Sequence, residues 1–160
     1  MFNIKNIFHL GWSHGEYLDY WSFIHLFTGI ILGIGTLIFS FNPFLSFFAL
    51  VILYIIYEGL EILVHISEGF WNIILDIVVG SVGSAVAIFF LPQILSMRDI
   101  FGILSIAIII DLMLVYGGWQ NFLQRKASEG SSYKLVLYAL CLIYFFGILI
   151  ALASFFYWLA

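Results

Sequence analysis

The chain has 160 residues, of which 64% are hydrophobic and 9% are charged, and its formal net charge is −4. Soluble globular domains carry about 25% charged residues, so this composition excludes a soluble domain and predicts an integral membrane protein. Only 5 residues are Lys or Arg, too few for a basic face, which excludes nucleic acid as a partner. The single cysteine, Cys141, excludes a disulfide framework and a cysteine-based metal site.

The N-terminal stretch "MFNIKNIFHLGWSHGEYLDYW" alternates apolar and polar residues and lacks a cleavage site for a signal peptide. We expect it to form a short segment at the membrane interface. Amphipathic aromatic rings favour the depth of the lipid headgroups, and this stretch carries four of them: Trp12, Tyr17, Tyr20 and Trp21.

Apolar runs dominate the rest of the chain. A helix needs about 20 apolar residues to cross a bilayer, and backbone groups in lipid must pair within their own segment. The runs lack the alternation of barrel strands. The sequence therefore predicts an all-α polytopic membrane protein, a single domain over residues 1–160 with five transmembrane helices. These are Tyr20–Phe41, Phe44–Val64, Phe70–Leu91, Ile100–Trp119 and Tyr133–Leu159, separated by "FNPF", "HISEG", "PQILSMRD" and the polar loop "QNFLQRKASEGSS".

Basic residues predict the orientation of the bundle. With five spans, the N-terminus and the second and fourth loops lie on one side, together with Lys5, Arg125, Lys126 and Lys134. The opposite side carries only Arg98. Loops rich in Lys and Arg stay in the cytoplasm, so we expect a cytoplasmic N-terminus and a C-terminus outside, which is the periplasm for a bacterial inner membrane.

Small residues recur at helical spacing in two of the spans. Gly29 and Gly33 form a G-x-x-x-G pattern in the first span, and the third span carries the run Gly80, Ser81, Gly83 and Ser84. Such residues let two helix backbones approach closely, so the pattern predicts packing between helices.

The stretch "YEGLEILVHISEGFWNIILD" concentrates ionisable residues at the end of the second span and the start of the third. At about 100° per residue, Glu58, Glu61, His65 and Glu68 fall on one face of a helix. We expect Glu68 to lie among the headgroups. Glu58 and Glu61 are predicted to lie inside the membrane, where carboxylates are costly and often functional.

The predicted topology brings further ionisable groups to the same level. The first span begins where the second ends and the third begins, so Asp19, His25 and Asp76 can join Glu58, Glu61 and His65 near the cytoplasmic face. Neighbouring carboxylates cannot all stay ionised without a proton or a cation. Carboxylates with imidazoles suit zinc, iron or manganese, so we take Glu58, Glu61, His65, His25 and Asp76 as candidate metal ligands.

A structural or interfacial role is the alternative for the same residues, and Asp19 in particular is expected at headgroup depth. Asp111 lies apart, inside the fourth span. It could complete the polar site or form a hydrogen bond to a neighbouring helix, and the second option is favoured. The sequence contains no G-x-S-x-G, H-E-x-x-H or P-loop motif.

Residues 19–85 resemble the VanZ-like group of small bacterial membrane proteins, and most closely its YjdF-like branch. The matching motifs are "DYWSFIHLFTG", "YEGLE" and "WNIILDIVVGSVG". The resemblance implicates Asp19, His25, Glu58, Glu61 and Asp76. This chain departs from the family pattern at three positions: Tyr20 replaces a Lys, Asn72 replaces an Asp, and Gly80 replaces an Asn. Members of the group are associated with glycopeptide tolerance and with lipid-linked modification of the cell envelope.

These observations leave three functions open. The first is a metal-dependent membrane enzyme that acts on a lipid or lipid-linked envelope substrate, with Glu58, Glu61, His25 and Asp76 as catalytic groups in a membrane pocket. The second is a protein that binds or transports cations or protons. The third is a structural subunit that assembles with other membrane subunits.

Overall fold

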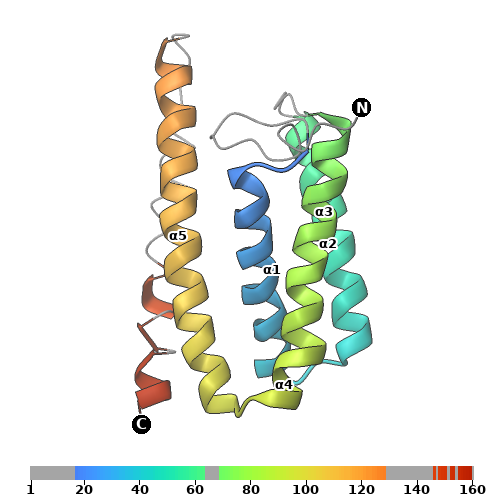
Figure 1. The fold of residues 1–160 in the computed structure, drawn as a ribbon, viewed down its shortest axis with the longest axis vertical. Helices are drawn as coiled ribbons and strands as arrows, with labels where there is room; N and C mark the ends of the chain where they lie inside the picture. Colours follow the sequence, from blue (N-terminus) through green and yellow to red (C-terminus); the bar gives the residue numbers. More distant parts are fainter. Residues whose placement is uncertain are drawn as a thin grey trace, which may run out of the picture.

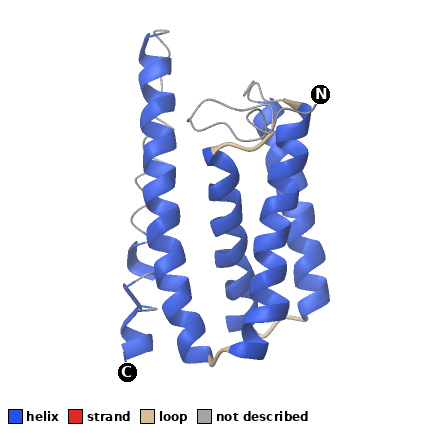
Figure 2. Cartoon of the chain, viewed as in Figure 1, coloured by secondary structure: helices blue, strands red, loops and turns tan. Residues whose placement is uncertain are grey.

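The structure is a computed structural model that describes residues 17–63, 69–128, 146, 148–150, 152–153 and 155–159. Within these ranges the regular secondary structure is helical, and Figure 2 shows helices joined by short loops. The predicted all-α class is therefore confirmed for the described residues. The interfacial segment predicted before Tyr17 lies outside them.

Four helical segments are long and apolar enough to cross a membrane: Tyr20–Ile38, Pro43–Leu60, Phe70–Ile94 and Met97–Gln120. Large apolar side chains, such as Phe48 at 62% exposure and Met113 at 70%, point away from the bundle, as expected for surfaces in contact with lipid. The protein is thus an integral membrane protein. The predicted fifth span, Tyr133–Leu159, lies largely outside the described residues, and its described part is a shorter apolar helix over Ile148–Leu159.

The helices run up and down in chain order (Figure 1). Helix α1 descends, α2 returns, and the third span descends as α3, a π-helical turn η2 and the short α4, before α5 ascends. The bounds are α1 Tyr20–Ile38, α2 Pro43–Leu63, α3 Phe70–Ala85, η2 Val86–Phe90, α4 Leu91–Ile94 and α5 Met97–Ser128.

Helix α5 is longer than the sequence predicts. The predicted span ended at Trp119 and was followed by a polar loop, but the helix continues to Ser128 and extends past the other helices in Figure 1. The reason is local. The stretch "QNFLQRKAS" is rich in good helix formers and contains neither Gly nor Pro, and the first Gly beyond it is Gly130.

The turn between α1 and α2 follows from its residues. Ser40 adopts a left-handed backbone conformation with φ of 54°. The Asn42 side-chain oxygen accepts hydrogen bonds from the backbone N–H groups of Phe44 and Leu45, each at 3.1 Å. Pro43 starts the helix, where its missing N–H costs nothing. The predicted break at "FNPF" is confirmed.

Close packing of α1 against α3 holds the first and third spans together. A Cβ atom on Gly29 would collide with the backbone carbonyl of Gly80, and one on Gly83 would collide with the carbonyl of Leu26. Only glycine permits this approach at both positions, which confirms the packing predicted from the small-residue pattern. An apolar core lies toward the other end of α1 and joins it to α5; its buried members are Ile34, Ala87, Ile100, Leu104 and Ile108.

Candidate functional site

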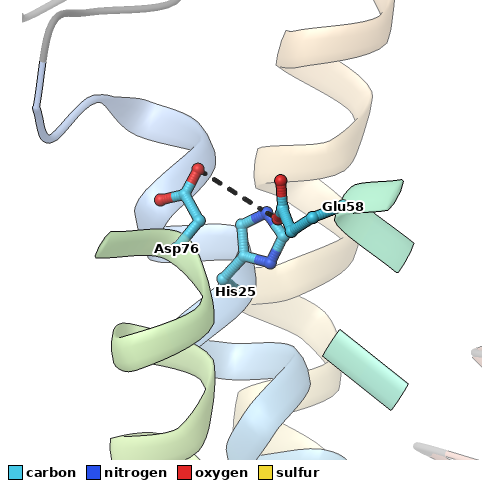
Figure 3. A group of neighbouring side chains, drawn as sticks. All are labelled: His25, Glu58 and Asp76. Atoms are coloured by element: carbon cyan, nitrogen blue, oxygen red, sulfur yellow. Dashed lines mark ion pairs between the residues drawn. The ribbon is translucent and has the colours of Figure 1, made fainter. Parts of the chain in front are cut away.

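Three ionisable side chains meet where α1 begins, α2 ends and α3 begins. His25 comes from the second turn of α1, Glu58 from the last turns of α2 and Asp76 from the second turn of α3. Figure 3 shows the three side chains converging from their three helices. We call His25, Glu58 and Asp76 the polar triad. Its position confirms the convergence predicted for these three residues.

The triad is compact and almost fully buried. Its exposed fractions are 9% for His25, 2% for Glu58 and 1% for Asp76. The His25 Nε2 atom lies 3.5 Å from Glu58 Oε1 and 3.8 Å from Asp76 Oδ2. One potential ligand atom from each residue lies within 4.8 Å of the other two, a spacing that could hold a metal ion.

The two distances from His25 Nε2 to the carboxylate oxygens can be compared with those of hydrogen bonds and of metal ligands. An N–H···O hydrogen bond is typically 2.7–3.2 Å long, shorter than both Nε2–oxygen distances. Ligands about 2.1 Å from a tetrahedral metal ion lie about 3.4 Å from each other. The 3.5 Å and 3.8 Å separations in the triad are close to that second value. The separations are compatible with three ligands around one ion, and both Nε2–oxygen distances also lie within the limit for an ion pair.

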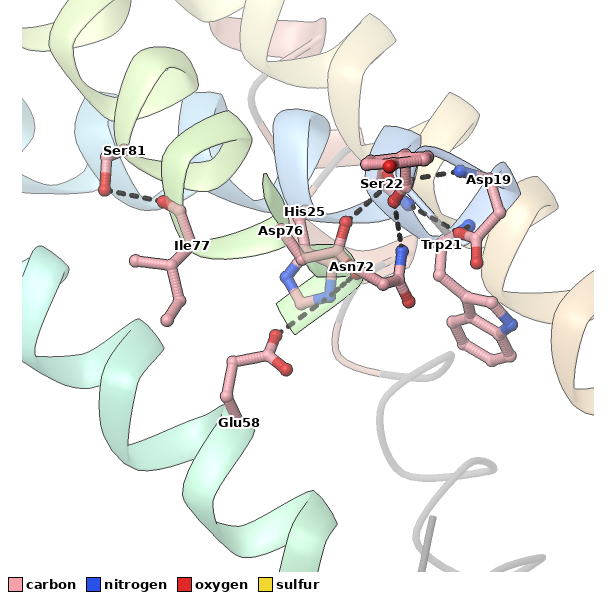
Figure 4. A network of polar contacts seen from close by, with 10 residues as sticks. Asp19, Trp21, Ser22, His25, Glu58, Asn72, Asp76, Ile77 and Ser81 are labelled. Carbon is pink, nitrogen blue, oxygen red and sulfur yellow. Dashed lines mark hydrogen bonds and ion pairs between the residues drawn. The ribbon is translucent and has the colours of Figure 1, made fainter. Parts of the chain in front are cut away.

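A hydrogen bond from Ser22 orients the Asp76 carboxylate. The Ser22 hydroxyl donates to Asp76 Oδ1 at 2.5 Å, which leaves Oδ2 facing His25. Ser22 is itself held by Asp19, the N-cap of α1, through a capping box in which each side chain accepts a bond from the other residue's backbone N–H. Figure 4 shows the hydrogen bonds that link Asp19, Ser22 and Asp76.

Asp19, which is expected at headgroup depth, is fully buried within the bundle. Its exposed fraction is 0%, and its carboxylate accepts the backbone N–H of Trp21 at 2.8 Å. The orphan N–H groups of a helix start attract a carboxylate, and here that start is packed inside the bundle. The orienting role of Ser22 was not predicted from the sequence. The signal was present, because Asp19 and Ser22 have the spacing of a capping box.

Asn72 lies one helical turn from Asp76 and is also fully buried. Its side-chain N–H₂ group donates to the Tyr17 carbonyl at 2.6 Å. Its Oδ1 atom has no hydrogen-bond partner among the residues that the structure describes. Asn72 therefore ties α3 to the segment before α1 and extends the polar region from the triad toward that end of the bundle.

The remaining predicted residues have different outcomes. Glu61 lies in α2, but its side chain is outside the described part of the structure. His65 and Glu68 lie wholly outside the described residues. Asp111 does not belong to the triad. It accepts a hydrogen bond from Thr28 on α1 at 3.5 Å, the interhelical option favoured from the sequence.

A layer of hydroxyl groups lies one to two helical turns from the triad, on the side away from the start of α1. The Ser84 hydroxyl donates to the Gly29 carbonyl at 3.1 Å, and Tyr54 and Ser84 share a hydrogen bond of 2.7 Å. Tyr54 is 4% exposed and Ser84 is 0% exposed. This layer was not predicted, since Tyr54 sits in an apolar run and Ser84 read only as a small packing residue.

The fold and the site together define a helical integral membrane protein with a buried His–Glu–Asp cluster. Comparison with protein-family models, with curated proteins and with solved structures found no match to the chain. The resemblance to VanZ-like and YjdF-like proteins therefore remains a prediction that rests on the three sequence motifs.

Proposed function

We propose that the protein binds one divalent transition-metal ion in the membrane at His25, Glu58 and Asp76. The observation that carries this proposal is the triad itself: three buried ligand atoms, from three helices, within 4.8 Å of one another. In helical bundles, metal sites are built in this way, from carboxylates and imidazoles on facing helices.

Charge balance supports a divalent cation. Two ionised carboxylates buried beside a neutral imidazole carry two negative charges, which is costly in a medium of low dielectric constant. A divalent cation neutralises both charges and supplies bonds to all three side chains. The ligand set of one imidazole and two carboxylate oxygens suits zinc, iron or manganese.

The finer proposal is a metal-dependent enzyme that acts on a lipid or lipid-linked envelope substrate. Three protein ligands leave a metal coordination position open, and catalytic zinc sites have this arrangement. When bound, such an ion would polarise an oxygen of the substrate or activate water. Glu58, His25 and Asp76 would hold it, and Ser22 would keep one oxygen of Asp76 turned toward it. Glu61 and His65 enter this proposal from the sequence alone.

The localisation proposed with this function is a bacterial inner membrane, with a cytoplasmic N-terminus and a periplasmic C-terminus. It is supported by the distribution of basic residues and by the VanZ-like motifs. In this orientation the triad lies near the cytoplasmic face.

Proton binding is the second candidate function, and the position of His25 favours it. The imidazole lies within ion-pair distance of both carboxylates. A protonated imidazole and one protonated carboxyl group would also balance the charge without a metal ion.

Elemental analysis of the purified protein separates the two candidates. We expect about one zinc, iron or manganese ion per chain in the wild type, and loss of that ion in Glu58→Gln and in Asp76→Asn, because each variant removes an anionic ligand. Asp111→Asn is the matched control. It changes an intramembrane carboxyl group outside the triad and should keep the metal. A folded wild-type protein that binds none of these metals when they are supplied would contradict metal binding and leave proton binding.

A further inference from the structure

We infer that the triad exchanges its ion with only one side of the membrane, the side where α1 begins. This inference rests on the proposed function in so far as the triad holds a cation. It follows from the groups that surround the triad above and below. The layer beneath it, made of Tyr54, Ser84 and the Gly29 carbonyl, acts as a closed floor, and we call it the hydroxyl floor.

The hydroxyl floor lies directly under the triad because of helical spacing. Tyr54 is one turn from Glu58 on α2, and Gly29 is one turn from His25 on α1. On α3, Ser84 is two turns from Asp76. Residues four apart lie above one another on a helix, so all three positions continue the inner face of the bundle toward the middle of the membrane.

The contacts within the floor indicate which acceptor each hydroxyl hydrogen of Tyr54 and Ser84 reaches. Ser84 has a single hydroxyl hydrogen, which it donates to the Gly29 carbonyl. While Ser84 donates to Gly29, the hydrogen shared between Tyr54 and Ser84 comes from Tyr54. The chain of donors runs from Tyr54 through Ser84 and ends on a backbone carbonyl, which holds no proton to pass on. The floor is therefore not a proton relay to the other side.

The packing at the floor is also too tight for an ion. The backbones of α1 and α3 touch at Gly29 and Gly80, where even a methyl group on Gly29 has no space. The Tyr54 ring covers Gly80, with ring atoms 3.4 Å from the position that a Cβ would take. A hydrated cation cannot pass between backbones in contact.

Beyond the floor the interior between α1, α2 and the third span becomes apolar, and the buried Ser105 hydroxyl on α5 donates to the Phe101 carbonyl of its own helix. The buried side chains that follow are Leu50 on α2, Ile34 on α1, and Ala87 and Ile88 on the third span, with exposed fractions between 0% and 8%. The next buried polar side chain on the inner face of α2 is Ser46, three turns from Glu58 and near the start of that helix. Entry of a charge into such an interior is strongly unfavourable.

Toward the other end, polar groups continue without a break. Ser22 and Asp19 follow Asp76, and Asn72 reaches the Tyr17 carbonyl at the point where α1 begins. Along the inner faces of α1, α2 and α3, a continuous run of polar partners therefore lies on this side alone, and the Thr28–Asp111 pair between α1 and α5 is separate from it. A site of this kind suits a resident cofactor or a ligand taken from one face of the membrane, and it does not suit conduction across the membrane.

Flux measurements on proteoliposomes test the inference. Vesicles loaded with a metal-sensitive or a pH-sensitive dye receive a Mn²⁺ gradient or a proton gradient. We expect vesicles with wild-type protein to leak at the same rate as vesicles with Glu58→Gln. Saturable wild-type flux of Mn²⁺ or protons that Glu58→Gln abolishes would overturn the inference. The proton arm needs no bound metal, so its result stands even if elemental analysis contradicts metal binding.

Removal of the metal by an impermeant chelator shows from which side of the membrane the triad is accessible. In a Cys141→Ser background, Phe41→Cys marks the α1–α2 turn at the opposite end of the bundle, where Phe41 is 60% exposed. An impermeant maleimide then reports the fraction of molecules with that turn facing outward. We expect an impermeant chelator to strip metal only from the remaining fraction. Loss of metal from all molecules would overturn one-sided access, and loss from the labelled fraction alone would show that the open side is the opposite one.

Discussion

At the residue scale, the site depends on how one carboxylate is held. Asp76 divides its two oxygens between Ser22, which donates a hydrogen bond, and His25, which lies 3.8 Å away. Partners that orient metal ligands often affect affinity strongly although they never touch the metal. Ser22 is thus a positioning residue for the proposed metal site, and Asp19 in turn positions Ser22.

Ser22→Ala should weaken metal binding about 10- to 100-fold, since Asp76 would lose the bond that fixes its orientation. Ser22→Thr keeps a hydroxyl group and should restore most of the affinity. Competition with a chromogenic chelator measures both. Equal affinity in wild type and Ser22→Ala, in protein of unchanged helix content, would show that the bond to Ser22 does not position the ligand.

At the element scale, α1 and α3 bring two of the three triad residues together through glycine contacts. The helices approach so closely because Gly29 and Gly83 carry no side chain where each meets a backbone carbonyl. In lipid there is no hydrophobic drive between helices, so this packing is a main source of the association of α1 with α3. The geometry of the triad therefore depends on glycines one turn or more away from it.

Gly29→Ala should destabilise the protein by about 1–3 kcal/mol, because the added methyl group forces the two helices apart. Gly35→Ala is the matched control on the same helix, since a Cβ there meets no atom within 4 Å. It should be neutral or stabilising by up to about 1 kcal/mol, the helix preference of Ala over Gly. Thermal unfolding in detergent compares the two. A similar loss in both would contradict the close-contact explanation.

At the scale of the whole molecule, the four described spans alternate in direction, so the two ends of the bundle face opposite sides of the membrane. The triad shares one end of the bundle with the start of α1, the end of α2, the start of α3 and the end of α5. The turns between α1 and α2 and between α4 and α5 share the other. Because the triad lies near one end of the bundle, access from that end alone means access from one side of the membrane alone.

Cysteine labelling in whole bacterial cells tests the proposed orientation. In a Cys141→Ser background, Phe41→Cys should react with an impermeant maleimide from the periplasm, whereas Gly69→Cys, just before α3, should react only after the inner membrane is opened. Both positions are exposed in the structure. The reverse pattern would contradict a cytoplasmic N-terminus, and labelling of both from one side would contradict the alternation of the spans.

The sequence by itself determined the all-α membrane class and the four described spans, because helices that cross lipid must be long and apolar and because Asn42, Pro43 and Gly69 mark breaks between them. Helical spacing and the order of the spans also predicted that His25, Glu58 and Asp76 would meet. Only the tertiary structure decided that Asp19 is buried, that Ser22 orients Asp76 and that Tyr54 with Ser84 closes the site from below. The bonds from Ser22 to Asp76 and between Tyr54 and Ser84 join residues 54 and 30 positions apart, and no local pattern in the chain encodes such contacts.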